Sequence, residues 1–154
     1  ELEQRITSCA RTACDPSRTL TRLHEFLLPL MPRNRFATAV VGAICDDGRL
    51  VIANAGHCPP LIVRNDGRIE EIGSTGPILG ILLNARWHTR VLHLEPGERL
   101  VLYSDGVTES VRGEEELGVC GLRNIVARTT DPRAILRELE RTSDDVTIVT
   151  VTRM

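Results

Sequence analysis

The sequence predicts an α+β fold with a largely antiparallel sheet, and three observations support this class. Near the amino terminus, apolar residues recur every three or four positions, which is typical of amphipathic helices. The middle of the chain carries short β-branched runs joined by Asp-Gly pairs, the pattern of successive hairpins. Two helical segments and a β-branched strand close the sequence. Together these elements indicate one compact domain over residues 1–154.

Two helices are predicted at the amino-terminal end, over residues 1–13 and 15–30. Asp15 and Pro16 suit the start of the second helix, as N-cap and first helical residue. The apolar residues that set the helical period are Ile6, Cys9, Ala10, Ala13, Leu20, Leu23, Leu27 and Leu30.

The period then changes to that of strands. Asp47-Gly48 and Asp66-Gly67 each join two apolar runs, which predicts two tight hairpin turns. The segment STGPILGILLNA, residues 74–85, is expected to be a loop packed over the sheet. The remaining predicted elements are a strand, a Pro-Gly turn and a strand over residues 87–104, helices over 122–129 and 131–142, and a strand over 144–153.

Composition excludes several classes of function. A net charge of -2 gives no electrostatic reason to bind nucleic acid or an acidic membrane. No apolar run reaches the ~20 residues of a membrane span, and the amino-terminal residues do not resemble a secretory signal, so the cytoplasm is expected. The five cysteines include no C-x-x-C pair, so they predict buried or partly buried thiols rather than a disulfide framework or zinc site.

The stretch LYSDGVTES, residues 102–110, contains a third Asp-Gly pair, Asp105-Gly106. A clear strand precedes it, but no returning strand follows, so the hairpin interpretation lacks its second half. Gly106 lets the backbone turn sharply, which leaves the Asp105 carboxylate at the end of the strand.

Asp144 and Asp145 form a second acidic site, directly before the last strand. Adjacent carboxylates repel each other, and a hard divalent cation such as Mg²⁺ or Mn²⁺ would offset that repulsion. Turns and solvated loops explain each motif equally well when it is taken alone, and spacing does not say that the two sites meet.

The order of the motifs resembles a known family. The segments NAGHCPP, GPILGI, LYSDGVTES and DDVTIVTV follow one another as in the bacterial metal-dependent serine/threonine phosphatases of the stage II sporulation and stress-response type. These enzymes are relatives of protein phosphatase type 2C. The resemblance runs from the first predicted helix to the carboxyl terminus.

The resemblance implies an antiparallel β-sandwich flanked by helices, with a two-metal site for Mn²⁺ or Mg²⁺ at one edge. It implies that a metal-activated water attacks phosphoserine or phosphothreonine. Asp105, with Gly106, matches one metal-binding motif, and Asp144 matches another, with Asp145 as adjacent support. Asp105 and Asp144 are therefore the expected catalytic residues.

The family also carries a Gly-Asp-x-x-Gly-His-Gly motif, whose Asp bridges the two metals, and this chain has none. The domain is thus expected to lack its first strands. A rearranged terminus, another chain as in a dimer, or a swapped element is then expected to cover the exposed edges. Three hypotheses stand. The chain is part of an active phosphatase, or a shortened inactive relative that acts as a regulatory protein-binding module, or a plain α+β interaction domain.

By resemblance, the expected substrate and partner is a phosphorylated anti-sigma-factor antagonist in partner-switching control of transcription. Asn54, Gly56 and His57 are interpreted as structural, with His57 bonded to backbone rather than metal. Trp87 and Tyr103 are predicted to be packing anchors, and Glu109 is predicted to face solvent.

Overall fold

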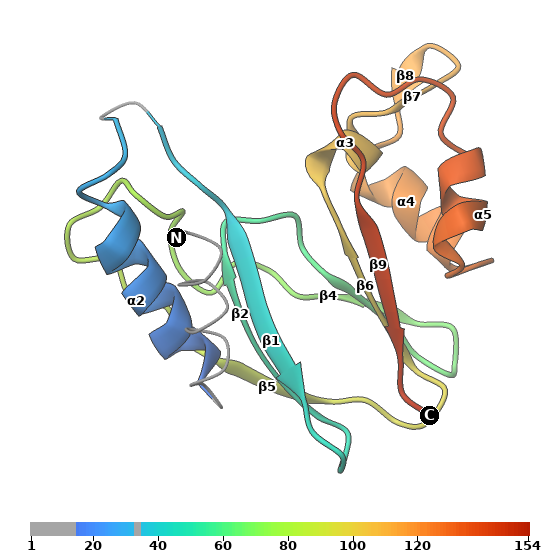
Figure 1. Cartoon of the computed structure of the whole chain (residues 1–154). Coiled ribbons are helices and arrows are strands. Elements are labelled where there is room, and N and C mark those ends of the chain that lie inside the picture. The colour runs from blue at the N-terminus through green and yellow to red at the C-terminus, as the bar shows by residue number, and fades with distance from the viewer. Residues whose placement is uncertain (1–14, 33–34) are drawn as a thin grey trace. The chain divides into compact units, whose positions relative to one another are not determined.

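The structure is a computed structural model that describes residues 15–32 and 35–154. The helix predicted over residues 1–13, with Cys9, lies outside these ranges, as does Cys14. The chain divides into two compact units that interleave along the sequence (Figure 1). The first unit comprises Glu1–His57 and Gly73–His93, and the second comprises Cys58–Ile72 and Leu94–Met154.

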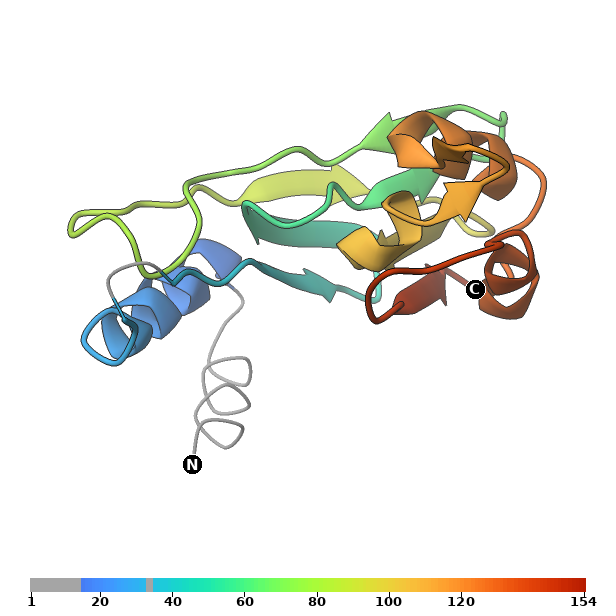
Figure 2. The ribbon, with the colours of Figure 1, turned by 90° about the horizontal axis from the view of Figure 1, so that it is seen from above.

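The first unit is a three-stranded antiparallel sheet with one helix packed on it. The helix is α2 (Pro16–Leu27), and the strand order is β1 (Ala39–Ile44), β2 (Arg49–Ala55), β5 (Arg90–His93). Figure 2 shows α2 lying beside this sheet. The helix packs on small residues of the sheet, where Ala39 is paired with Ala55 and Val41 with Ala53. Leu20 of α2 is fully buried there.

The start of α2 follows from its sequence. The Asp15 carboxylate accepts hydrogen bonds from the amides of Ser17 and Arg18, and Pro16 begins the helix. The Thr89 hydroxyl donates to the same carboxylate at 3.0 Å, so the cap also ties the helix to the segment before β5. The helix ends at Leu27, three residues before the predicted end, so Leu30 is left 64% exposed.

The second unit is a four-stranded antiparallel sheet with helices on one face. The strand order is β4 (Ile69–Glu71), β3 (Leu61–Val63), β6 (Arg99–Tyr103), β9 (Ile148–Thr152). The helices are α3 (Asp105–Thr108), α4 (Gly118–Val126) and α5 (Pro132–Arg137), and a small hairpin joins β7 (Val111–Arg112) to β8 (Glu115–Glu116). Alternate strand residues such as Leu61 and Val101 pack against Leu122 and Ile125 of α4.

These elements confirm the α+β class and the antiparallel sheets. Asp47-Gly48 and Asp66-Gly67 lie in hairpin turns, and Gly48 and Gly67 have φ values of 87° and 83°, which glycine adopts without strain. The predicted helix over 131–142 is shorter, because only Pro132–Arg137 is helical. Single-domain organisation over residues 1–154 stays a prediction.

Buried side chains bear out some predictions and correct another. Trp87 is 7% exposed and Tyr103 is 2% exposed, as expected for packing anchors, and the Trp87 ring nitrogen donates to the Pro77 carbonyl at 2.8 Å. The expectation of buried or partly buried thiols was wrong for Cys120, which is exposed on α4, whereas Cys45 and Cys58 are partly buried. Among the described residues, no helix is both long enough and apolar enough to cross a bilayer.

A buried ion-pair network fixes the β3–β4 hairpin to the turn before β6. Arg64 donates to the carboxylates of Glu98 at 2.7 Å and Glu70 at 2.6 Å. Glu98 also accepts from the amide of Glu95 at 2.9 Å, and it is only 6% exposed. Removal of Glu98 would take an acceptor from the Glu95 amide and leave Arg64 with Glu70 as its carboxylate partner.

We expect Asp15→Ala to lower the free energy of unfolding by about 1 kcal/mol, because two helix amides lose their acceptor. Asp15→Asn keeps an oxygen at the same place and should lower it less. Urea titrations of the parent and both variants measure the difference. Equal stability of Asp15→Ala and the parent would contradict this role of the cap.

The Glu98 network should make stability depend on pH. Burial raises the pKa of Glu98, but the Glu95 amide and the Arg64 guanidinium outweigh it, and the pKa lies below its ordinary value. The stabilisation is therefore present above the ordinary value and lost as pH falls through the lowered one. We expect Glu98→Gln to make unfolding free energy less pH-dependent below about pH 4.

At neutral pH, we expect Glu98→Ala to lower the free energy of unfolding by about 2 kcal/mol, because Arg64 and the Glu95 amide each lose a charged acceptor while Arg64 keeps Glu70. The exposed Glu114 provides the control, because Glu114→Gln should change neither the stability nor its pH profile. A Glu98→Gln profile that overlays that of the parent would show that the network does not contribute.

Candidate functional site

Asp105 lies where β6 ends and the short helix α3 begins. Its carbonyl accepts from the Glu109 amide at 2.8 Å, and its carboxylate accepts from the Gly106 amide at 3.2 Å. The side chain is exposed. Asp105-Gly106 is therefore not a hairpin turn, and the carboxylate stands at the end of a strand as predicted.

Asp144 and Asp145 lie in the loop before β9, and Ser104 holds this loop against the end of β6. The Ser104 amide donates to the Thr147 carbonyl at 3.0 Å, and the Ser104 hydroxyl donates to the Asp145 carbonyl at 3.1 Å. The Thr147 amide donates back to the Ser104 hydroxyl at 2.9 Å. These bonds extend the β6–β9 pairing by one step beyond Tyr103 and Ile148.

The two acidic segments can approach this closely only because Gly106 has no side chain. A Cβ atom at Gly106 would lie 2.5 Å from the Asp145 carbonyl oxygen and 3.2 Å from the Asp144 carbonyl oxygen. Both distances involve main chain, which cannot rotate away as a side chain can. The structure thus brings Asp105-Gly106 and Asp144-Asp145 together, a contact that the sequence alone did not reveal.

The oxygen atoms available here suit a hard cation. The Asp144 carboxylate accepts from the Asp145 amide at 2.7 Å through Oδ1. Within the described ranges, the second carboxylate oxygen of Asp105 and of Asp144 receives no hydrogen bond, and both side chains are exposed. Carboxylate oxygens are the ligands that Mg²⁺ and Mn²⁺ favour. The residues present therefore fit part of a metal site. They do not complete one, because no group of three or more metal-ligating side chains occurs in the described residues.

Two side chains near the acidic site were not singled out as site residues from the sequence. Burial raises the pKa of the Cys58 thiol, and the negative charges of Asp105 and Glu109 raise it further. Burial also raises the pKa of Tyr103, whose hydroxyl has no hydrogen-bond partner in the described part of the chain. Both groups are therefore neutral at physiological pH. Glu109 is exposed, as predicted.

In the first unit, Asn54 organises the NAGHCPP turn. It is fully buried, its side-chain oxygen accepts from the His57 amide at 2.8 Å, and its side-chain nitrogen donates to the His57 carbonyl at 3.0 Å. The His57 ring contacts the Thr38 hydroxyl at 3.1 Å, so its partner is a side chain, whereas a backbone partner was predicted. The structural interpretation of Asn54 is confirmed.

Comparison with curated proteins finds relatives that match part of the chain. Protein IcfG of Synechocystis is 40% identical over 76 residues, which is 49% of this chain and 12% of that protein. Phosphoserine phosphatase RsbU of Bacillus subtilis is 29% identical over 106 residues, which is 68% of this chain and 32% of that protein. The chain thus spans less than two thirds of the length of either relative.

Solved structures show the same fold. The PP2C phosphatase domain of SpoIIE from Bacillus subtilis, solved with a fragment of its regulatory domain, matches with a TM-score of 0.81 and 17% identity. The match covers 98% of this chain and 48% of that chain. The family sequence model described as Stage II sporulation protein E (SpoIIE) matches residues 1–154. The chain therefore belongs to the SpoIIE family and has the PP2C-like phosphatase fold.

Proposed function

We propose that this chain is part of a Mn²⁺- or Mg²⁺-dependent protein serine/threonine phosphatase. The observation that carries the proposal is the close approach of Gly106 to the backbone of Asp144-Asp145, because it brings together two distant chain segments that each carry an exposed aspartate. Membership of the SpoIIE family and the name of RsbU, a phosphoserine phosphatase, support the same reaction.

In this proposal, Asp105 and Asp144 hold the metal through their carboxylates, with Asp145 and the Gly106 backbone beside them. The bound metal would acidify a water and neutralise charge on the phosphoryl group. Ser104 and Thr147 keep the two proposed metal-holding segments in register through their reciprocal hydrogen bonds. The Cys58 thiol, which is neutral, adds no charge to the site.

The family motif that supplies a bridging carboxylate is not among these 154 residues. We propose that this third carboxylate comes from a segment outside them, or from another chain in a dimer or swapped arrangement. The catalytic machinery is then shared between this chain and that segment. Activity is expected to be much greater in a longer protein that contains both.

We propose that the substrate is phosphoserine on an anti-sigma-factor antagonist, which makes that protein the partner in sigma-factor regulation. The similarity to RsbU supports this assignment. A cytoplasmic location is part of the same proposal, because such a partner acts where transcription is controlled.

The test is Mn²⁺-dependent hydrolysis of an aryl phosphate and of a phosphoserine protein, by this chain and by a longer protein that contains it. We expect Asp105→Asn and Asp144→Asn each to abolish metal-dependent activity, because each removes a ligand charge. Far-ultraviolet circular dichroism should show both variants folded, with stability unchanged or slightly higher without metal, since carboxylate repulsion is reduced.

Glu114→Gln is the matched control, because Glu114 is an exposed acidic residue that belongs to neither motif, and its activity should equal that of the parent. Full activity in both aspartate variants would remove the site assignment. A folded longer protein without any phosphatase activity would favour the other reading of the family resemblance, a regulatory module that binds its partner without catalysis.

Gly106→Ala should damage the site without removing a charge. The new methyl group would lie 2.5 Å from the Asp145 carbonyl oxygen, so the loop must move. We expect a loss of about 1–3 kcal/mol in the free energy of unfolding, together with weaker Mn²⁺ binding. Gly73→Ala is the control, since a Cβ there meets no atom within 4 Å. Equal Mn²⁺ affinity in Gly106→Ala and the parent would show that the close approach does not shape the site.

A further inference from the structure

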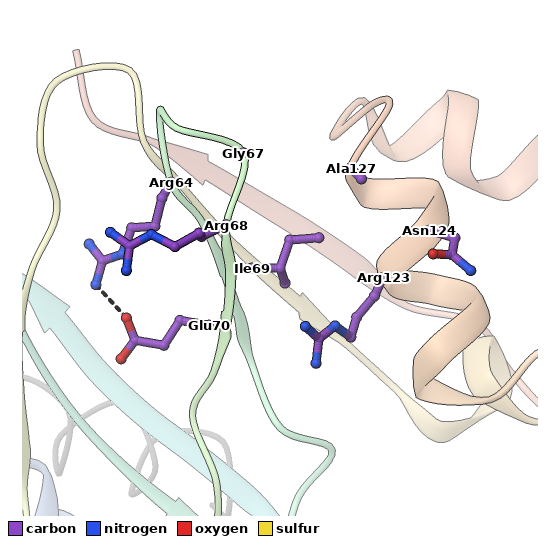
Figure 3. Close-up of a pocket in the computed structure, with 8 residues that line it drawn as sticks. All are labelled: Arg64, Gly67, Arg68, Ile69, Glu70, Arg123, Asn124 and Ala127. Atoms are coloured by element: carbon purple, nitrogen blue, oxygen red, sulfur yellow. Dashed lines mark hydrogen bonds and ion pairs between the residues drawn. The ribbon is translucent and has the colours of Figure 1, made fainter.

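The second unit contains a hollow of about 550 Å³ between the β3–β4 hairpin and α4. Figure 3 shows Arg123 reaching from α4 toward β4, while Arg64, Arg68 and Glu70 belong to the hairpin. The residues that line it are Arg64, Gly67, Arg68, Ile69, Glu70, Arg123, Asn124 and Ala127. All of them belong to one compact unit.

This hollow is separate from the acidic site. Val63 is the last residue of β3 before the hairpin turn, and it pairs with Arg99 at the start of β6. The acidic site follows Tyr103, at the other end of β6. Four residues of strand correspond to about 13 Å. The hollow and the carboxylates of Asp105 and Asp144 therefore lie toward opposite ends of the same sheet.

Three arginines and one glutamate line the hollow, and Arg64 is paired with both Glu70 and Glu98. Arg68 pairs with Asp66 through Nε at 2.7 Å, and Arg123 pairs with Glu71 through Nη1 at 2.8 Å. A guanidinium group has five N–H donors, so each pair leaves most of them available. Both arginine side chains are substantially exposed, at 79% and 45%. They can therefore receive a second carboxylate.

The same place offers an open strand edge. β4 is the outer strand of its sheet. The Arg64 amide donates to the Arg68 carbonyl, and the Ile72 amide donates to the Pro60 carbonyl, so alternate residues from Arg68 face β3. In an antiparallel pair, the residues between them direct their main-chain groups away. Ile69 and Glu71 thus present N–H and C=O groups at the outer edge of the sheet.

We propose that this edge is a docking site for an extended acidic segment of a protein partner. The segment adds as a strand to β4, through the main-chain groups of Ile69 and Glu71, and its carboxylates meet Arg68 and Arg123. An extended peptide fits better than a compact anion, because the arginines flank a strand edge rather than converge on one point. The docking site does not depend on the phosphatase chemistry proposed above.

The test uses a fluorescein-labelled peptide of repeating Glu-Glu-Val-Val, which presents glutamates on both faces of the added strand, with fluorescence anisotropy as the readout. We expect saturable binding that weakens as salt is raised. The double variant Arg68→Gln/Arg123→Gln should bind about tenfold more weakly, because two charge-assisted contacts are lost. Glu71→Gln should bind more tightly, because it removes the carboxylate that competes for Arg123.

Arg128→Gln is the matched control, since Arg128 follows α4 and pairs with Glu138 outside the hollow. Amide hydrogen exchange should slow at Ile69 and Glu71 when the peptide binds, which electrostatic attraction alone would not produce. The proposal is overturned if the double variant binds as well as Arg128→Gln, if those amides are unaffected, or if a lysine–valine peptide binds equally. Displacement of the peptide by an equal concentration of inorganic phosphate would also overturn it, as that indicates a compact anion site.

Discussion

The contact between the end of β6 and the loop before β9 is the constraint on which the acidic site depends. Gly106 packs directly on the carbonyl groups of Asp144 and Asp145, and Ser104 exchanges hydrogen bonds with Thr147. Both interactions involve main chain, so they fix the two segments regardless of how the carboxylates rotate. The acidic side chains themselves are exposed. In the proposed function, this backbone contact would hold the two segments together against the mutual repulsion of their carboxylates.

The local features of the fold could be predicted from the sequence. These features depend on residues close in the chain: the Asp15 cap, the turns at Gly48 and Gly67, and the end of β6 at Asp105, where no hairpin turn follows. The contacts across the sheets could not, because they depend on pairing between distant segments. Arg64 and Glu98 are 34 residues apart, and no periodic pattern links them. The contact of Gly106 with Asp145 is also between distant segments, and an Asp-Gly pair alone does not show which part of the backbone lies against it.

The Pro-Gly turn between β5 and β6 shows why a correct local prediction can leave the topology open. The turn is present, with the Glu98 amide donating to the Glu95 carbonyl at 3.0 Å. Its two strands nevertheless do not pair with each other, because β5 pairs with β2 and β6 pairs with β3. Glu98 lies just after this turn and reaches the hairpin through Arg64, so the turn serves as an anchor between strands rather than as the tip of a hairpin.

The interleaved order of the two units has a consequence for synthesis on the ribosome. The three-stranded sheet can close once β5, at residues 90–93, has emerged, whereas the four-stranded sheet waits for β9, at residues 148–152. β3 and β4 emerge early and must remain without β6 meanwhile. Pairings this distant in sequence close slowly. The acidic site is therefore among the last parts of these 154 residues to assemble, because its two segments meet only when β9 pairs with β6.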